Sequence, residues 1–144
     1  MHKVDIYTDG SCSKNPGPGG WCAILVSGEH EAIVSGYMPE TTNNRMELFA
    51  VIAGLQRLKK PCNVEIFSDS TYVVNAFNEG WIHNWQKKSW KNVKNDDLWR
   101  QLLQVMQPHN VSFNWVKGHA DNEYNNRCDK IAVAETQKYI ANHS

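Results

Sequence analysis

The sequence lacks any apolar run long enough to span a membrane. Nowhere in its 144 residues do ~18 apolar residues follow one another without interruption. The first residues, Met-His-Lys-Val-Asp, also lack the apolar stretch of a secretion signal. We therefore expect a cytoplasmic protein with no membrane association, and the initial Met1 favours a free-standing protein.

Closely spaced cysteine pairs and an excess of one charge are also missing. The four cysteines are far apart, which argues against a cysteine-rich zinc site and predicts reduced thiols. Lys plus Arg total 15, and Asp plus Glu also total 15, so any basic surface that binds nucleic acid must be local. No linker or internal repeat interrupts the chain, and we expect residues 1–144 to form a single domain.

The sequence does contain a strand pattern that occurs twice and ends in aspartate each time. Residues 4–9 read Val-Asp-Ile-Tyr-Thr-Asp, and residues 64–69 read Val-Glu-Ile-Phe-Ser-Asp. Both alternate apolar and polar residues, as a strand does. If the strands are parallel neighbours, Asp9 and Asp69 meet at one edge of the sheet. A strand-terminal Asp often only caps a turn, but two carboxylates about 4 Å apart repel by roughly 4 kcal/mol at a dielectric near 20, which favours a cation between them.

The remaining patterns predict an α/β protein in which a five-stranded mixed sheet carries helices on both faces. The expected strands span residues 3–8, 20–26, about 31–38, 63–68 and 111–116. The expected helices lie between residues 44 and 59, at 70–79 with Asp69 or Ser70 as the cap, from 96 to about 106, and at 126–140. The Pro- and Gly-rich residues 15–20 are expected to form a rigid loop that no strand enters. Residues 80–95 are not assigned.

Two further acids stand where helices are expected to begin. Glu47 could complete a capping box with Asn44, and Asp129 could be an ordinary solvated acid at a helix start. Both helices could also bring these acids to the edge that carries Asp9 and Asp69. Four carboxylates without cysteine suit a hard cation such as Mg²⁺ or Mn²⁺. Two such ions roughly 4 Å apart could hold a phosphate for in-line displacement.

His119 follows the last expected strand and precedes the helix that carries Asp129. A histidine in a loop is most often a surface residue. At this position it could instead lie over the acidic residues and transfer a proton.

Taken together, these residues resemble bacterial type 1 ribonuclease H. The resemblance runs from residue 4 to about residue 135. It is carried by motifs in the family's order and at family-like spacing: Asp9–Cys12, Asn15–Gly20, Thr42–Leu48, Ser68–Ser70, Trp81–Trp85, Asp97–Trp99, Trp115–His119 and Asn125–Asp129.

The resemblance implies the ribonuclease H fold and endonucleolytic cleavage of the RNA strand of RNA–DNA hybrids. It implies a two-metal-ion mechanism that leaves 5′-phosphate and 3′-hydroxyl ends. By this resemblance Asp9, Glu47, Asp69 and Asp129 would bind two Mg²⁺ ions, for which Mn²⁺ could substitute, and His119 would be the histidine of a catalytic loop. The partner would be the hybrid duplex, and a monomer is expected.

The resemblance also implies substrate contacts. Cys12, Asn15, Asn43 and Asn44 would contact the minor groove, where the 2′-hydroxyl distinguishes RNA from DNA, and Thr42 and Asn95 would help hold a DNA phosphate. The three asparagines also suit turns and helix caps. A basic handle at about residues 80–95 would contact the backbone through residues that include Trp81, Trp85, Lys87 and Lys88, although the tryptophans could be core residues.

The chain departs from the family pattern in three places, and other functions remain open. The handle is shorter and less basic, Glu40 stands where relatives often carry a basic residue, and Thr71 replaces a common glutamine. The alternative function is a non-catalytic RNA–DNA hybrid-binding module of the same fold. Such a module would have no reason to keep a repulsive set of carboxylates. The Thr42–Asn44 segment and the handle argue against another nuclease of this fold, such as a resolvase or an exonuclease. The initial Met1 argues against a domain cut from a reverse transcriptase.

Overall fold

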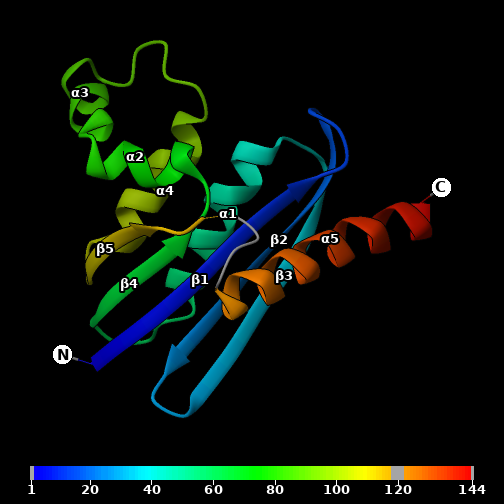
Figure 1. Cartoon of the computed structure of the whole chain (residues 1–144). Helices are drawn as coiled ribbons and strands as arrows, with labels where there is room; N and C mark the ends of the chain where they lie inside the picture. Colours follow the sequence, from blue (N-terminus) through cyan, green and yellow to red (C-terminus); the bar gives the residue numbers. More distant parts are fainter. Residues whose placement is uncertain (1, 118–121, 144) are drawn as a thin grey trace.

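Five strands form one mixed sheet in the computed structural model, which describes residues 2–117 and 122–143 (Figure 1). The strand order is β3-β2-β1-β4-β5. β1 pairs antiparallel with β2 and β2 antiparallel with β3, whereas β4 is parallel to both β1 and β5. The predicted mixed sheet is therefore confirmed. The strands are β1 (His2–Cys12), β2 (Gly17–Ser27), β3 (His30–Thr41), β4 (Cys62–Ser68) and β5 (Asn110–Trp115).

Five helices accompany the sheet in the described residues. They are α1 (Asn43–Gln56), α2 (Thr71–Asn78), α3 (Trp81–Lys87), α4 (Asp96–Met106) and α5 (Glu123–His143). α3 occupies part of the segment that the sequence left unassigned, and Ser70 rather than Asp69 caps α2. In the described ranges, no helix combines the length and the apolar composition that crossing a membrane requires.

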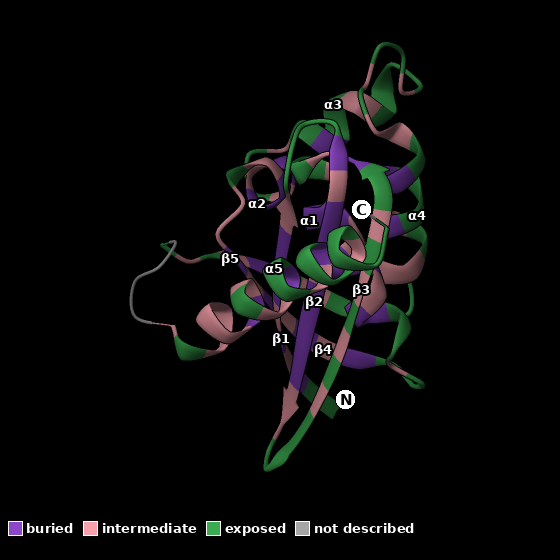
Figure 2. Ribbon diagram, turned by 90° about the vertical axis from the view of Figure 1, so that its right-hand side faces the viewer, coloured by how far each residue is buried: buried purple, intermediate pink, exposed green. Residues whose placement is uncertain are grey.

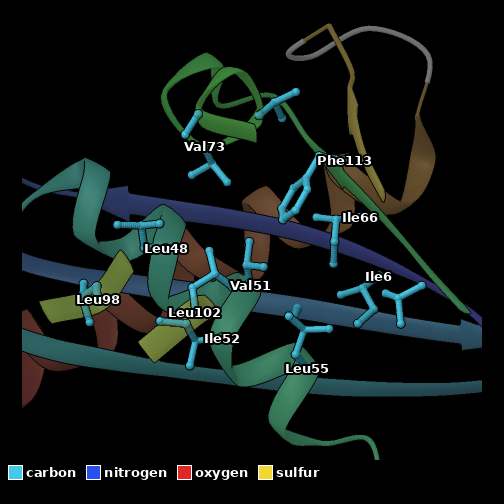
Figure 3. Close-up of a cluster of buried hydrophobic side chains, with 14 of the residues drawn as sticks. Ile6, Leu48, Val51, Ile52, Leu55, Ile66, Val73, Leu98, Leu102 and Phe113 are labelled. Atoms are coloured by element: carbon cyan, nitrogen blue, oxygen red, sulfur yellow. The ribbon is translucent and has the colours of Figure 1, made fainter. Parts of the chain in front are cut away.

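Apolar side chains are buried on both faces of the sheet. On one face, Ile6 and Ile66 pack against α1 (Figure 3). α2 lies beside α1 over β4 and β5, and α4 packs on α1. On the other face, Cys22 and Ile24 of β2 pack against α5, which lies across β1, β2 and β3 (Figure 2). Successive residues of a strand point to opposite faces, so β2 contributes apolar side chains to the packing on both faces of the sheet. Helices therefore cover both faces, as predicted.

The expectation that residues 15–20 exclude a strand is wrong, because β2 begins at Gly17. Pro18 cannot donate a backbone hydrogen bond, and β2 accommodates it at a shift of register between Gly17 and Gly19. β1 also continues beyond Asp9 to Cys12, since β2 pairs with it along this stretch. Asp9 therefore lies inside a strand and not at its end.

Candidate functional site

The parallel register of β1 and β4 brings Asp9 and Asp69 to the same level of the sheet. The last paired residues are Tyr7 and Phe67, and each aspartate follows two residues later. β4 ends at Ser68, so Asp69 lies just beyond its strand while Asp9 is still held by β2 opposite Cys22. The meeting of the two carboxylates at one edge of the sheet follows directly from the repeated hexapeptide.

Glu47 reaches these aspartates because α1 packs directly on Gly10. A Cβ placed on Gly10 would lie 2.5 Å from the Glu47 backbone nitrogen, so only glycine allows this approach. The capping-box interpretation of Asn44 and Glu47 is wrong. Thr42 caps α1 by accepting a hydrogen bond from the Arg45 N–H (3.3 Å), and Glu47 is buried in the second turn.

The three acids form a compact cluster of oxygen ligands. One carboxylate oxygen from each of Asp9, Glu47 and Asp69 lies within 4.8 Å of the other two. Asp129 is half-buried in α5 and lines a small cavity together with Asp9 and Asp69. The four acids predicted from the sequence are therefore carried by β1, by α1, by the residue after β4 and by α5.

Burial and mutual repulsion make Asp9 and Glu47 difficult to ionise without a cation. Burial, then the charge of Asp69 and a hydrogen bond with Asp129, raise the pKa of Asp9 to about 8, although the Gly10 N–H donates to its Oδ1 (3.0 Å). Burial raises the pKa of Glu47 well above its usual range, and the charges of Asp9 and Asp69 add to this effect. Within the described residues, Glu47 Oε1 is buried and has no hydrogen-bond partner. A divalent cation would offset both the burial of these carboxylates and their mutual repulsion, since hard cations bind carboxylate oxygens. The residues present therefore fit such an ion.

A second cavity, of about 510 Å³, opens beside the N-terminus of α1. It is lined by Asn15, Pro16, Thr42, Asn43, Asn44, Lys94 and Asn95. Asn43 and Asn44 are exposed, whereas Asn15 Oδ1 accepts a hydrogen bond from the Asn43 backbone N–H (2.8 Å). The structure thus gathers five of the predicted substrate-binding residues around one hollow.

Cys12 lies close to the same region. Its thiol is within hydrogen-bonding distance of the Thr41 carbonyl (3.5 Å), one residue before the cap of α1. β1 ends at Cys12, so this side chain follows Asp9 along the strand toward the N-terminus of α1.

The side chain of Asn95 is held by a polar network between helices. Arg45 of α1 donates to Asn95 Oδ1 (3.1 Å) and forms a two-pronged ion pair with Asp97 (3.1 and 2.8 Å). Asn95 Nδ2 donates to the Tyr72 hydroxyl (3.0 Å), which also accepts from the indole N–H of Trp99 (3.1 Å). Asn95 keeps one amide N–H for a further partner, so the network orients this side chain and leaves one of its donors available.

The tryptophans of the handle divide between core and surface. Trp81 is 38% exposed, whereas Trp85 packs between Trp81 and Trp99 with ring centroids 6.4 and 5.2 Å away. Lys87 and Lys88 are exposed at the end of α3. Lysines and one indole ring are therefore free to meet a phosphate backbone, while Trp85 anchors the segment.

Sequence reasoning assigned no role to Lys117 or Asn125, and it placed one residue that the structure does not describe. Lys117 and Asn125 share the small cavity with Asp9 and Asp69, whereas Lys94, a lysine of the predicted handle, lines the larger cavity. Asn125 could have been noticed because it precedes Asp129 by four residues and thus lies on the same helix face. His119 lies outside the described residues.

A mainly apolar cleft lies at the opposite end of β1. It has a volume of about 440 Å³ and includes His2, Val4, Leu25 and Cys62 in its lining. None of the four acids lines it, so it plays no part in the site described above.

Comparison with known proteins adds a family match over nearly the whole chain. A family model described as RNase H matches residues 1–137. A protein named ribonuclease H from Caldanaerobacter subterraneus subsp. tengcongensis is 54% identical over 142 residues, which cover 95% of this chain and 93% of that relative. Another ribonuclease H, from Prosthecochloris aestuarii, is 56% identical over 135 residues, with 90% and 92% coverage.

Solved structures show the same fold. LC9-RNase H1, described as a type 1 RNase H with the type 2 active-site motif, matches with a TM-score of 0.87 and 28% identity, covering 96% of this chain and 74% of that one. LC11-RNase H1, solved in complex with an RNA/DNA hybrid, matches with a TM-score of 0.69 and 24% identity, covering 95% and 99%. At that identity, the second likeness shows the fold alone.

Proposed function

The chain belongs to the ribonuclease H family, and from that premise we propose how its residues cleave the RNA strand of RNA–DNA hybrids. The enzyme is a ribonuclease H that hydrolyses RNA paired with DNA. The observation that carries the mechanism is the cluster of Asp9, Glu47 and Asp69, whose ligand oxygens lie within 4.8 Å of one another. A non-catalytic binding module would gain nothing from this repulsive cluster.

In our proposal, Asp9, Glu47, Asp69 and Asp129 hold the divalent metal, with Mg²⁺ as the physiological ion and Mn²⁺ as a substitute. Two bound cations would supply activation of a water molecule and stabilisation of the departing 3′-oxygen. The carboxylates fix the position of the scissile phosphate relative to that water. His119 moves a proton or assists product release, and the products carry a 5′-phosphate and a 3′-hydroxyl.

Recognition of the hybrid is assigned to the surface beside the N-terminus of α1. Asn44 and Glu47 are three residues apart on this helix. About one helical turn therefore separates the side chain proposed to contact the minor groove from the carboxylate proposed to bind the metal. Cys12, Asn15, Asn43 and Asn44 would contact the minor groove, where the 2′-hydroxyl both donates and accepts hydrogen bonds. Thr42 and Asn95 would hold a DNA phosphate in the 510 Å³ cavity, close to Lys94.

The handle would bind the sugar-phosphate backbone at a distance from the reaction. Lys87 and Lys88 would neutralise phosphates, and the exposed Trp81 ring would cover a sugar or a base. Trp85 would support this contact from the core side.

We also propose that the enzyme acts as a single-domain monomer in the cytoplasm. All four carboxylates of the site come from one chain, so no second copy is needed to complete it. The four cysteines are free, as expected in a reducing compartment.

A cleavage assay on end-labelled duplexes tests the proposal. RNA–DNA, RNA–RNA and DNA–DNA duplexes are incubated with and without Mg²⁺, with the Asp9→Asn variant as a control for contaminating nuclease. We expect cuts only in the RNA strand of the hybrid, only with the metal, and with 5′-phosphate ends. Cleavage in the presence of chelator, or equal cleavage of RNA–RNA, would refute the mechanism.

A further inference from the structure

Asn125, in the first turn of α5, ties together the two strands that carry Asp9 and Asp69. Its amide nitrogen donates to the Phe67 carbonyl of β4 (3.0 Å) and to the Thr8 carbonyl of β1 (3.4 Å). The parallel pairing of these strands ends at Tyr7 and Phe67. The Asn125 amide therefore bridges the strands where their backbone pairing stops.

The bridged carbonyls are next to the acids of the site. Thr8 directly precedes Asp9, and Phe67 stands two residues before Asp69. Asp129 follows Asn125 by four residues on α5, one turn along the same face. One side chain thus fixes the relative positions of three segments that each carry a carboxylate.

The amide oxygen of Asn125 does not take part in the contact with β1 and β4. Two carbonyl oxygens can be satisfied only by the NH₂ group, which settles which end of the amide faces the strands. Asn125 Oδ1 is buried, and among residues 2–117 and 122–143 it has no hydrogen-bond partner. A buried acceptor without a partner is rare in folded proteins and points to a donor that completes it.

A cavity that Asn125 lines is large enough for such a donor. It measures about 10 Å³ and is lined by Asn125, Asp9, Asp69 and Asp129, together with Val116, Lys117 and Asn126. A volume of ~10–15 Å³ on this measure holds one water molecule when polar partners surround it. A water here could donate one hydrogen to Asn125 Oδ1 and the other to a carboxylate.

We propose that Asn125 is a positioning residue of the cleavage reaction. Its NH₂ group sets the spacing of Asp9 and Asp69, and its Oδ1 accepts a hydrogen bond from a water molecule held between these acids. The proposal rests on the proposed function, because the spacing matters only if the acids bind metal together. Side chains that orient metal ligands in this way typically change metal affinity or activity by about 10–100-fold when they are removed.

The test compares Asn125→Ala with a matched control, Asn114→Ala. The Asn114 amide also links strands, since it donates to Glu65 Oε1 (2.9 Å) and to the Ile66 carbonyl (3.3 Å), but Asn114 does not line the acidic cavity. Mg²⁺ affinity is measured by calorimetry without substrate, stability is measured by denaturant titration in chelator, and kcat and KM are measured on the hybrid. Asn125→Ser, which keeps one donor, is used if the alanine variant does not fold.

Asn125→Ala should bind Mg²⁺ about 10–100-fold more weakly and lose kcat by a similar factor. Asn114→Ala should lose comparable stability yet keep its Mg²⁺ affinity and kcat within about twofold of wild type. Wild-type Mg²⁺ affinity and kcat in a folded Asn125 variant would overturn the proposal and leave a purely structural role. If wild type itself neither binds Mg²⁺ nor cleaves the hybrid, the proposed function fails first, so the two failures are distinguishable.

Discussion

Gly10 of β1 and Glu47 of α1 are in direct backbone contact, and this contact decides whether the carboxylates meet. A Cβ on Gly10 would lie 2.5 Å from the Glu47 nitrogen and 2.6 Å from the Met46 carbonyl carbon. Backbone cannot move aside as a flexible side chain can. Any side chain at position 10 must therefore push α1, and Glu47 with it, away from Asp9.

Gly10→Ala should consequently impair both stability and metal binding. Overpacking typically costs about 1–3 kcal/mol, and a displaced Glu47 should weaken Mg²⁺ binding by at least about tenfold. Denaturant titration and calorimetry measure the two effects. Gly28→Asn is the control, because Gly28 lies in an open turn at φ +59° where an added Cβ would meet nothing within 4 Å, and Asn tolerates this conformation. Wild-type Mg²⁺ affinity in Gly10→Ala would show that Glu47 does not need this contact.

Asp9→Asn and Asp69→Asn should each abolish cleavage without unfolding the protein. Each change removes a negative charge from a repulsive cluster, so the metal-free variants should melt at the same temperature as wild type or higher. Asp97→Asn is the opposing control, since it removes a partner of Arg45 and should cost up to about 1 kcal/mol at this exposed ion pair. Marked destabilisation of both cluster variants in chelator would instead give these aspartates a purely structural role.

The raised pKa of Asp9 predicts how metal-free stability depends on pH. Burial, followed by the charge of Asp69, raises that pKa to about 8 from an unfolded value near 3.8. The folded protein therefore holds a proton that the unfolded chain releases, so this contribution is present at low pH and is lost as the pH rises through about 8. Denaturant titration in chelator should show this contribution falling between about pH 4 and 8 and levelling off above that range, and the slope should flatten in Asp9→Asn.

The same proton is expected to compete with the metal. Mg²⁺ affinity should rise as the pH approaches about 8, because Asp9 must ionise to bind the ion. Calorimetry in two buffers with different ionisation enthalpies would count the protons released. Equal heats in both buffers would mean that the acids are already ionised in the metal-free protein.

Changing Lys87, Lys88 and Lys91 to Ala together should weaken hybrid binding and leave catalysis intact. Removal of each phosphate contact should reduce the slope of log affinity against log salt by roughly 0.7–0.9. KM should rise while kcat at saturation changes little, because these lysines bind the ground state and the transition state alike. The triple change of Lys3, Lys59 and Lys60 to Ala alters the net charge equally at the far end of the protein. If both triple variants shift the salt slope equally, the handle has no specific role.

His119→Ala should slow turnover without abolishing it. Positioned proton transfer typically contributes about 10²–10⁴-fold, but the metals can assist both the attacking and the leaving oxygen. We expect a loss in kcat near or below about 100-fold, far smaller than that of Asp9→Asn, with KM nearly unchanged. Single-turnover kinetics would separate the chemical step from product release. A wild-type kcat across pH 6–9 would reduce His119 to a surface residue.

Much of the architecture follows from local sequence patterns. Alternating residues in β1 and β4 predict two strands of the same register, and this register alone brings Asp9 and Asp69 together. Apolar residues at helical spacing predict α1, and Asp96 and Asp97 mark the start of α4. These features can be read from the chain because strand and helix periods are set by backbone geometry within a few residues.

Contacts between segments far apart in the sequence determine the features that local patterns do not predict. Pro18 enters a strand because β3 and β1 flank it at a register shift, and Glu47 faces the aspartates because Gly10 admits the backbone of α1. Asn125 joins two strands that lie 117 and 58 residues before it in the chain. No local pattern encodes such pairings, since they depend on which surfaces pack together once the chain is folded. The sequence by itself therefore determined the elements and the identity of the acids, and the packing of α1 and α5 on the sheet determined that they form one site.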